Sequence, residues 1–345
     1  MKLEPLQQEF VFEDDRPFAS CHASTLVSLA DGTVLAAWFG GTRESADDVA
    51  IWLSVRSSGI WSAPEEAADE EGLPHWNPVL FSPDGRRVFL YYKVGKTIPN
   101  WETRVMESPD GGRTWTEPRP LVPGDRGGRG PVRNKPIVLH DGTWLAPASV
   151  ETNEYWDAFV DISTDHDASW GMSGWVPLPQ KRNLSQEKRV SPPNPPLVPE
   201  SSFAGRGVIQ PTLWESQPQH VHMLLRSTAG WVYRSDSTDG GRNWCAAYPT
   251  ELPNNNSGID VVQTEPGCLV LVYNPIGSNW GERTPLSMAV SMDNGQIWQN
   301  AFVLEDDPGE YSYPAIVSPA GDRVLITYTW RRERIAFWEF RVTHS

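Results

Sequence analysis

A short turn that recurs along the chain constrains the fold more than any other feature of the sequence. The pattern Ser-x-Asp-x-Gly-x-x-Trp runs from Ser108 to Trp115, from Ser237 to Trp244 and from Ser291 to Trp298. A divergent copy runs from Ser163 to Trp170, and a more degenerate one ends at Trp61. In such a turn the Asp caps backbone N–H groups, the Gly takes a positive φ, and the Trp packs over the hairpin.

The spacing of these turns indicates a repeat architecture. The tryptophans that end them are separated by 54, 55, 74 and 54 residues. Repeats of this length are typical of solenoids, propellers and arrays. The longest interval contains residues 181–201, which are polar and rich in Pro, so we expect a surface loop there and no domain boundary.

Each turn is preceded by two β-rich runs with an Asp-Gly or similar pair between them, which predicts a β-hairpin. Six four-stranded units around one axis would form an all-β, six-bladed propeller, as a single domain over residues 1–345. We expect the N-terminal EFVFE and the C-terminal IAFWEFRVTH to share the closing sheet. The six copies of the hairpin begin at His22, Asn77, Lys135, Gln210, Gly258 and Tyr313.

The composition of the chain narrows the classes of partner that it could bind. The net charge of −15 argues against nucleic acid or an anionic membrane, although a local arginine cluster could still hold a small anion. Three cysteines without metal-ligand spacing predict neither a disulfide framework nor a metal site, and no cofactor is expected. No apolar run approaches the ~20 residues that span a bilayer. We expect a cytoplasmic protein, and secretion with a removed signal peptide stays open.

The functional site of a propeller is expected where the innermost strands begin, around the axis. Several of these positions carry polar or aromatic side chains that a purely structural strand would not need. Any one of them taken singly is about as well explained as a satisfied core residue. As a group they predict a site, formed by His22, Trp76, Asn77, Arg133, Asn134, Lys135, Gln210, Asn256 and Tyr311.

The repeated turn is similar to the Asp box, and nearly the whole chain resembles the sialidase superfamily of BNR or Asp-box repeat proteins. Arg226 precedes an Asp box as the second arginine of that family's carboxylate-binding triad does, and Arg283 resembles the third. Tyr311 stands in the place of the tyrosine nucleophile. The loop from Gly40 to Asp48 resembles the loop that holds the acidic proton donor, and it contains Arg43, Asp47 and Asp48.

Two positions depart from the family pattern. His22 stands where the resemblance places the first triad arginine, and Gln210 stands where it places the glutamate that activates the tyrosine. A neutral amide cannot accept the phenol proton, and a tyrosine with a pKa near ~10 is a poor nucleophile without a base. The ordinary retaining mechanism is therefore not expected. His22, with an unperturbed pKa of ~6.5, is a candidate general acid or base beside Tyr311.

The resemblance implies an exo-acting glycoside hydrolase on a sialic-acid-like or uronic-acid-containing glycan. Arg226 and Arg283 would hold the carboxylate, while His22, Tyr311, Asp47 and Asp48 are the candidates for catalysis. Two alternatives stay open: a polysaccharide lyase on a uronate glycan, and a non-catalytic glycan-binding propeller. An enzyme should bring a proton donor and a proton acceptor within reach of one bound sugar.

Overall fold

Antiparallel strands joined by tight turns make up nearly all the regular structure in this computed structural model, which describes residues 1–125, 127–179 and 205–343. These residues form 25 strands and one short 3₁₀ helix, η1 (Ile98–Asn100). Their hydrogen bonds define five sheets. The chain is therefore all-β, as the sequence predicts.

Two sheets come from the first third of the chain. The first has five strands, β2 (Ser20–Ser28), β3 (Val34–Gly41), β4 (Ala50–Ser57), β5 (Ile60–Trp61) and β6 (Glu65–Ala68). The second has four, β7 (His75–Phe81), β8 (Val88–Val94), β9 (Glu102–Ser108) and β10 (Arg119–Pro120). Every residue of β3, β7 and β8 is buried, because these strands are covered on both faces by neighbouring sheets.

The middle of the chain forms one eight-stranded sheet that contains two meanders. The first meander comprises β11 (Ile137–Val138), β12 (Trp144–Glu151), β13 (Tyr155–Ser163) and β14 (Gly171–Met172). The second comprises β15 (Arg206–Gln217), β16 (His220–Ser227), β17 (Trp231–Ser237) and β18 (Tyr248–Pro253). A short parallel pairing of β13 with β15 joins them.

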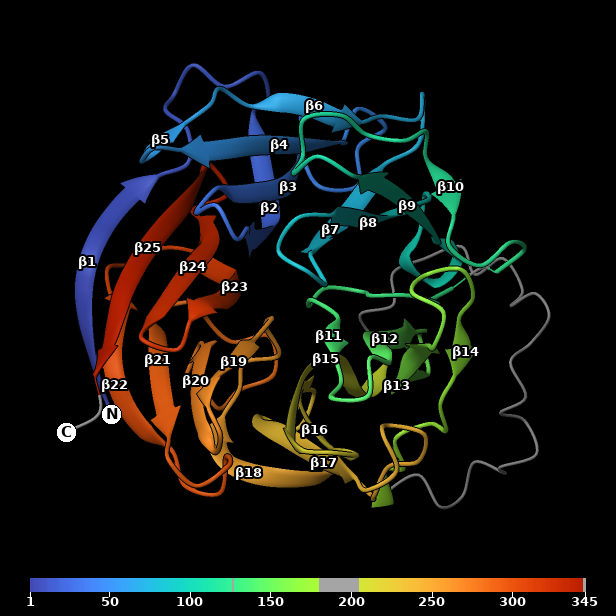
Figure 1. The fold of residues 1–345 in the computed structure, drawn as a ribbon, viewed down its shortest axis with the longest axis vertical. Coiled ribbons are helices and arrows are strands. Elements are labelled where there is room, and N and C mark those ends of the chain that lie inside the picture. Colours follow the sequence, from blue (N-terminus) through green and yellow to red (C-terminus); the bar gives the residue numbers. More distant parts are fainter. Residues whose placement is uncertain (126, 180–204, 344–345) are drawn as a thin grey trace.

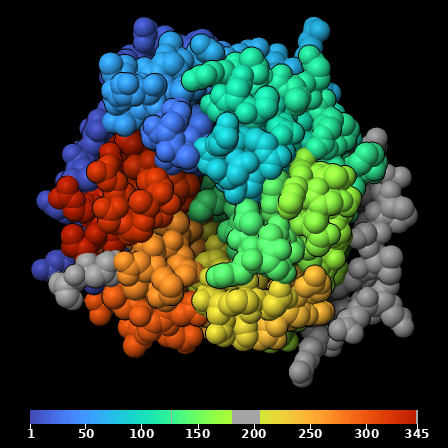
Figure 2. Space-filling model, in the orientation of Figure 1, coloured from blue at the N-terminus to red at the C-terminus, as the bar shows by residue number. Residues whose placement is uncertain are grey.

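Two four-stranded sheets complete the ring. One contains β19 (Asp260–Glu265), β20 (Cys268–Tyr273), β21 (Leu286–Ser291) and β22 (Gln299–Glu305). The other contains β23 (Tyr311–Ala320), β24 (Arg323–Trp330), β25 (Arg334–Thr343) and β1 (Lys2–Phe10). The sheets lie around a common centre as a β-propeller, with β2, β7, β11, β15, β19 and β23 nearest the middle (Figure 1). The face in view is hollowed near the middle of the ring (Figure 2).

The two ends of the chain lie in one sheet, which confirms the expectation that the N-terminal and C-terminal strands share a sheet. Strand β1 pairs antiparallel with β25, from Lys2 opposite Thr343 to Phe10 opposite Ala336. The N-terminal strand precedes the predicted EFVFE segment and overlaps it only at Glu9 and Phe10. The predicted surface loop over residues 181–201 lies outside the described residues, and the count of six blades stays a prediction. No helix among the described residues is long and apolar enough to span a membrane.

The recurring turns have the local chemistry that their residues predict. In the complete copies, the aspartate accepts a hydrogen bond from the backbone N–H four residues on, as Asp239 does from Asn243 at 2.9 Å. The serine two positions earlier accepts the N–H of the glycine, as Ser237 does from Gly241 at 3.0 Å. That glycine has a φ of 80°. In the divergent copy Asp167 takes the corresponding position with a φ of 83°, which explains why its sequence is hard to recognise.

The innermost strands share a bulge near their first residues. The pairing register of β2, β7, β15 and β23 shifts there, and in each bulge one residue has a positive φ. A bulge turns side chains away from the regular alternation and often lies beside a functional site. The residues with positive φ are Ala23, Asn77, Gln210 and Tyr313.

A buried carboxylate on the propeller axis joins the inner strands. Asp260 accepts hydrogen bonds from Lys135 Nζ at 2.9 and 2.8 Å, and from Thr212 Oγ1 at 2.6 Å. It also accepts the backbone N–H of Ile316 at 2.9 Å. Asp260 begins β19, so this one group links the inner segments of four successive units. The ammonium group of Lys135 is therefore used in this interior contact. The sequence predicted that Lys135 would contact substrate, but its side chain binds Asp260.

We predict that Lys135→Met lowers the free energy of unfolding by about 3–5 kcal/mol, because it leaves the buried charge of Asp260 without its cation. Arg323→Met is the control, since Arg323 pairs with Glu339 at 2.7 Å and its side chain is 50% exposed. That exposed pair should be worth about 1 kcal/mol or less. Urea denaturation followed by tryptophan fluorescence measures both, and equal losses would contradict the role given to Asp260.

Candidate active site

A partly exposed tyrosine surrounded by arginines lies where the inner strands begin. The guanidinium carbons of Arg133, Arg283 and Arg226 lie 5.2, 5.3 and 5.8 Å from the ring centroid of Tyr313. Arg133 precedes β11, Arg226 is near the end of β16, and Arg283 precedes β21. Three segments far apart in the sequence thus gather positive charge on one aromatic side chain.

Arg226 is held at the centre of a hydrogen-bond network. Its Nη1 donates to Tyr313 Oη at 2.9 Å and to Gln210 Oε1 at 3.1 Å. Its Nε donates to Asn256 Oδ1 at 3.0 Å, and Asn256 in turn donates to Asn279 at 2.9 Å. The predicted residues Gln210 and Asn256 therefore both bind Arg226. The guanidinium has little freedom to turn, which suits fixed recognition of an anion.

Arg283 belongs to a chain of alternating charges at the edge of the site. Its Nη1 donates to Glu310 Oε1 at 2.7 Å, and Arg332 Nε donates to the same oxygen at 2.9 Å. Arg332 Nη1 also donates to Glu44. This bond holds the loop of residues 42–48, which connects β3 and β4, beside the site. Burial by itself would raise the pKa of Glu310, but Arg283 and Arg332 outweigh it and lower that pKa. Glu310 is thus an ionised partner of the two arginines.

His22 lies against Tyr313 and is almost completely buried. The two rings are 4.2 Å apart between centroids, and His22 is 1% exposed. Its Nδ1 is 2.9 Å from Thr329 Oγ1. Burial lowers the pKa of His22 well below its usual value, and Arg332, Arg283, Arg133 and Arg226 lower it further. The imidazole is therefore neutral at neutral pH. His22 was proposed as a general acid or base because its pKa was expected near the working pH, and that expectation is wrong.

Arg133, Arg226 and Arg283 form an arginine cluster around Tyr313. The side-chain hydroxyl of Tyr311 is bound by Arg331 and not by this cluster, which corrects the place given to Tyr311. Its hydroxyl accepts hydrogen bonds from Arg331 at 3.2 and 3.1 Å. Its ring is 1% exposed and packs among the apolar side chains between β20, β21 and β24. Tyr311 and Tyr313 are two positions apart on β23, so a regular strand would place both on the same face. The bulge at Tyr313 and Pro314 interrupts this alternation, and the two side chains therefore have different surroundings. Tyr313 is the tyrosine in contact with Arg226.

The candidate acids of the 42–48 loop differ in how they are held. Asp48 accepts hydrogen bonds from the hydroxyl and the N–H of Thr42, and the hydroxyl is the main reason that its pKa is lowered. Asp48 therefore shapes the loop. Asp47 has a side chain that is 64% exposed and lies 3.9 Å from Lys96. Arg43 is also exposed.

The other predicted site residues support the site from within. Trp76 is 5% exposed and donates its indole N–H to Gly95 O at 2.8 Å. Asn77 donates to Val132 O at 3.0 Å, and Asn134 donates to Gln210 O at 3.1 Å. Arg133 donates to Pro314 O at 2.6 Å, and burial lowers its pKa to about 10. The contacts of Asn77 and Asn134 join neighbouring units, and that of Arg133 reaches strand β23.

Four residues of the site were missed by the sequence reasoning: Tyr313, Glu151, Glu310 and Arg332. Tyr313 could have been found, because it precedes Pro314 as Asn77 precedes Pro78 and Gln210 precedes Pro211. Glu151 lies behind Gln210, whose amide is 3.4 Å from it, and burial raises the pKa of Glu151 while Arg226 opposes the rise. Arg332 lies in the turn between β24 and β25, where no repeat signals its role.

The arrangement can bind an anion beside a phenol oxygen that is held in place. Arg226 and Arg283 both face Tyr313, and a guanidinium can hold a carboxylate through two parallel hydrogen bonds. The hydrogen bond from Arg226 fixes the position of Tyr313 Oη. Among the described residues, no group of three or more His, Cys, Asp or Glu side chains is placed to hold a metal ion.

Comparison with known proteins agrees with this architecture. The family model for the BNR repeat-like domain matches residues 32–326. A Hadza microbial sialidase superposes with a TM-score of 0.75 at 15% identity, over 97% of this chain and 68% of that one. A Dyadobacter fermentans protein of unknown function superposes with a TM-score of 0.76 at 14% identity, over 99% of both chains.

The Trypanosoma rangeli sialidase bound to the inhibitor DANA gives a TM-score of 0.69 at 12% identity, over 98% of this chain and 57% of that one. The same sialidase has been solved with 2,3-difluorosialic acid as a covalent intermediate. No curated protein matches the chain in sequence. At these identities the structural likeness establishes the fold and leaves the activity open.

We predict that His22 makes folding less favourable as the pH falls. Its pKa is lowered in the folded state, so below the unfolded value of ~6.5 the unfolded chain binds a proton that the folded chain does not. This effect is absent above about pH 7 and grows by about 1.4 kcal/mol per pH unit below ~6.5. Urea denaturation between about pH 7 and pH 5 should show a smaller loss for His22→Gln than for the unmodified protein. His220→Gln is the control, and an NMR titration of His22 near its ordinary pKa would contradict the prediction.

Proposed function

The chain belongs to the BNR repeat-like domain family, and from that premise we propose that it is an exo-acting glycoside hydrolase on a glycan ending in an acidic sugar. The observation that carries the proposal is the pair of guanidinium groups, Arg226 and Arg283, within 5.8 Å of the partly exposed Tyr313 ring. Two arginines beside one accessible ring suit a sugar whose carboxylate is sialic-acid-like or belongs to a uronic acid.

In this proposal each residue has one task. Arg226 and Arg283 bind the carboxylate, and Asp47 gives a proton to the leaving oxygen from the exposed 42–48 loop. Tyr313 takes a proton from the attacking water, and the Arg226 hydrogen bond holds Oη in place for that transfer. His22 supports the tyrosine ring from inside as a neutral group. Tyr313 does not form a bond to the sugar.

β-Elimination at a uronate is a second candidate, and one observation favours it. In the part of the chain that the structure describes, Tyr313 Oη has a hydrogen bond from Arg226, with the neutral Gln210 beyond, and none with a carboxylate. A carboxylate held by arginine acidifies the neighbouring C–H bond of the sugar. A phenolate at Tyr313 could then remove that proton, while the glycosidic oxygen leaves.

We also propose that the two meanders of the eight-stranded sheet are separate blades, so that one domain contains six blades over residues 1–345. Two observations support this count. Among the described residues, the strands of the two meanders pair only at Tyr155 and Trp156, in parallel, and each meander has its own Ser-x-Asp turn. The capping of those turns by aspartate agrees with Asp boxes.

The proposal predicts that cleavage requires a free carboxylate on the substrate. A screen of methylumbelliferyl sialosides, glucuronides and uronic-acid oligosaccharides should give one active class, and its methyl ester should react about 10²–10⁴-fold more slowly, because two charged hydrogen bonds are lost. Ultraviolet absorbance of an unsaturated uronate would mark elimination in place of hydrolysis. Calorimetric binding without turnover would instead favour the non-catalytic glycan-binding propeller.

The corrected assignment predicts opposite behaviour for two tyrosines on the same strand. Tyr313→Phe should lower kcat by about 10²–10⁴-fold, the range for removing a group that transfers protons. Tyr311→Phe is the matched control and should change kcat by less than about threefold. Treatment with 2,3-difluorosialic acid should leave Tyr313 unmodified by mass spectrometry. A covalent sugar on Tyr313, or equal losses in the two variants, would refute the proposed roles.

A further inference from the structure

An ion-pair chain leads from the arginine cluster to the edge of the site. Its members, in order, are Arg283, Glu310, Arg332 and Glu44. Their side chains are between 20% and 38% exposed, so all of them reach solvent. Arg283 belongs to the arginine cluster and Glu44 to the 42–48 loop, so the ion-pair chain joins these two parts of the site.

Arg332 is held in the ion-pair chain by a backbone turn that arginine does not favour. Arg331 and Arg332 lie in the turn between β24 and β25, with φ angles of 52° and 59°. Such turns ordinarily contain Asn or Gly, because a Cβ atom makes the left-handed region unfavourable. Cys21 donates its N–H to Arg332 O at 2.9 Å, and Arg331 donates its own to Glu310 O at 2.7 Å. A strained turn fixed in this way is typical of a site where the side chains have a function.

Two members of the ion-pair chain have a polar atom left for a ligand. Arg283, Arg332 and Ser312 all bind Oε1 of Glu310, whereas Oε2 has no hydrogen-bond partner among the described residues. Arg332 uses Nε and Nη1 for Glu310 and Glu44, which leaves Nη2 without a partner in the same part of the chain. Neither Oε2 nor Nη2 is one of the buried atoms that lack a partner, so both are open to solvent.

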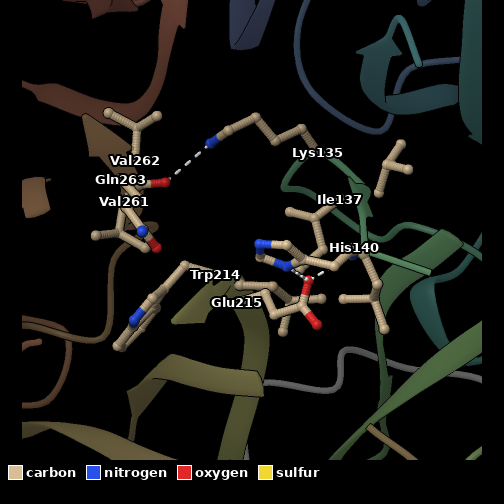
Figure 3. Close-up of a pocket in the computed structure, with 11 residues that line it drawn as sticks. Lys135, Ile137, His140, Trp214, Glu215, Val261, Val262 and Gln263 are labelled. Carbon is tan, nitrogen blue, oxygen red and sulfur yellow. Dashed lines mark hydrogen bonds and ion pairs between the residues drawn. The ribbon is translucent and has the colours of Figure 1, made fainter. Parts of the chain in front are cut away.

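The charged groups at the opposite end of the axis are used within the protein. A cavity of about 350 Å³ lies there, beside the second half of β15. Lys135 reaches across it to Val261 O at 3.0 Å, and Glu215 lies 2.6 Å from His140 (Figure 3). Polar recognition of a glycan is therefore expected at the ion-pair chain and not in this cavity.

The proposed function puts the leaving group of the substrate beside the ion-pair chain. Asp47 is the proposed proton donor to the leaving oxygen, and Glu44 lies three residues before it on the same loop. Three residues of chain extend over at most about 11 Å. Because Arg332 binds Glu44, a sugar that leaves at Asp47 is within reach of both side chains.

The charges of the ion-pair chain favour an uncharged leaving group that carries hydroxyls. Arginine and glutamate alternate in it in equal numbers, whereas no carboxylate among the described residues binds Arg226 or Arg133. An acidic leaving group would be repelled by Glu310, which is ionised. A hydroxyl group both donates and accepts, so neighbouring hydroxyls of a sugar match an acceptor that lies beside a donor.

We propose that Glu310, Arg332 and Glu44 form a subsite for the leaving group and that this group is a neutral sugar. Glu310 Oε2 accepts a proton from one hydroxyl, and Arg332 Nη2 donates to a neighbouring hydroxyl. Arg332 is thus a specificity-determining residue, which selects the sugar joined to the acidic one and does not hold the carboxylate. This inference rests on the proposed glycosidase function for the position of the leaving group.

Two pairs of probes share an acidic sugar and differ in the group attached to it. One pair is methyl α-sialoside and 3′-sialyllactose, and the other is methyl β-glucuronide and β-glucuronosyl-(1→3)-galactose. Calorimetry on the full chain carrying Tyr313→Phe measures binding without turnover. In the pair that binds, the compound with the neutral sugar should have a Kd roughly 10- to 100-fold lower, because it gains two hydrogen bonds to charged groups. A counterpart whose second sugar is also acidic, α-2,8-disialic acid or β-glucuronosyl-(1→4)-glucuronic acid, should show no such gain.

Variants of the ion-pair chain test which residue recognises the neutral sugar. Arg332→Met should raise the Kd of the larger compound by roughly 10-fold and that of the methyl glycoside by less than about threefold. Arg334→Met is the matched control, since Arg334 belongs to the same hairpin, is 20% exposed and pairs with Asp14, and it should change neither Kd. Glu44→Ala should remove part of the same preference, because Arg332 then loses a partner that orients it. Thermal unfolding of each variant confirms that the fold is kept.

Four outcomes would overturn the inference. They are equal Kd values within each pair, equal weakening of both members of a pair by Arg332→Met, tighter binding of the doubly acidic counterpart, and no binding of either pair at millimolar concentration. Equal weakening would mean that Arg332 acts only through Arg283. Failure of the proposed function has a different signature: the unmodified protein cleaves neither pair, while the preference for the neutral sugar and its loss in Arg332→Met remain.

Discussion

The buried carboxylate of Asp260 is the contact on which the architecture depends most. It receives Lys135, Thr212 and the backbone of Ile316, so inner segments of four successive units converge on one residue. If all side chains along the axis had the same polarity, nothing would fix how far each unit is shifted along the axis relative to its neighbours. These directional hydrogen bonds fix that position. The same contact divides the axis into two environments. Arginines gather at one end, and a cavity lined by Leu213, Trp214 and Val261 among others occupies the other.

The electrostatics of the axis differ from those of the whole chain. A net charge of −15 would repel anions at long range, yet at the axis burial lowers the pKa of His22 and four arginines lower it further. Glu44 and Glu310 balance part of that charge, and they pair with Arg332 and Arg283. The guanidinium groups are thus oriented before any ligand arrives. Preorganised donors of this kind cost little reorganisation when an anion binds.

Local patterns in the sequence predicted the fold well and the site only in part. The Ser-x-Asp turns and the β-rich runs fix hairpins through contacts a few residues apart, and the propeller follows from their repetition. Arg226 and Arg283 were also found, because each precedes such a turn. Tyr311 was chosen from its resemblance to the family's tyrosine nucleophile, whereas the bulge after Ser312 brings Tyr313 to the arginines, and the sequence does not reveal that bulge. Trp76 and Lys135 were expected to face the ligand, but whether a side chain at the axis points outward or inward is decided by partners such as Gly95 and Asp260 in other units. Arg332 enters the site from a turn outside the repeat.

The pairing of β1 with β25 has a consequence for biosynthesis. Lys2 lies opposite Thr343, so β1 leaves the ribosome well before its partner, which is 341 residues further along the chain. At ~5–20 residues per second, that interval is roughly 20 to 70 s. During it, the backbone N–H and C=O groups of β1 remain open to other nascent chains on the same message. The strand is short of apolar residues for its length, with Gln7, Gln8 and Glu9 near its end, and this composition makes unproductive pairing less favourable while synthesis continues.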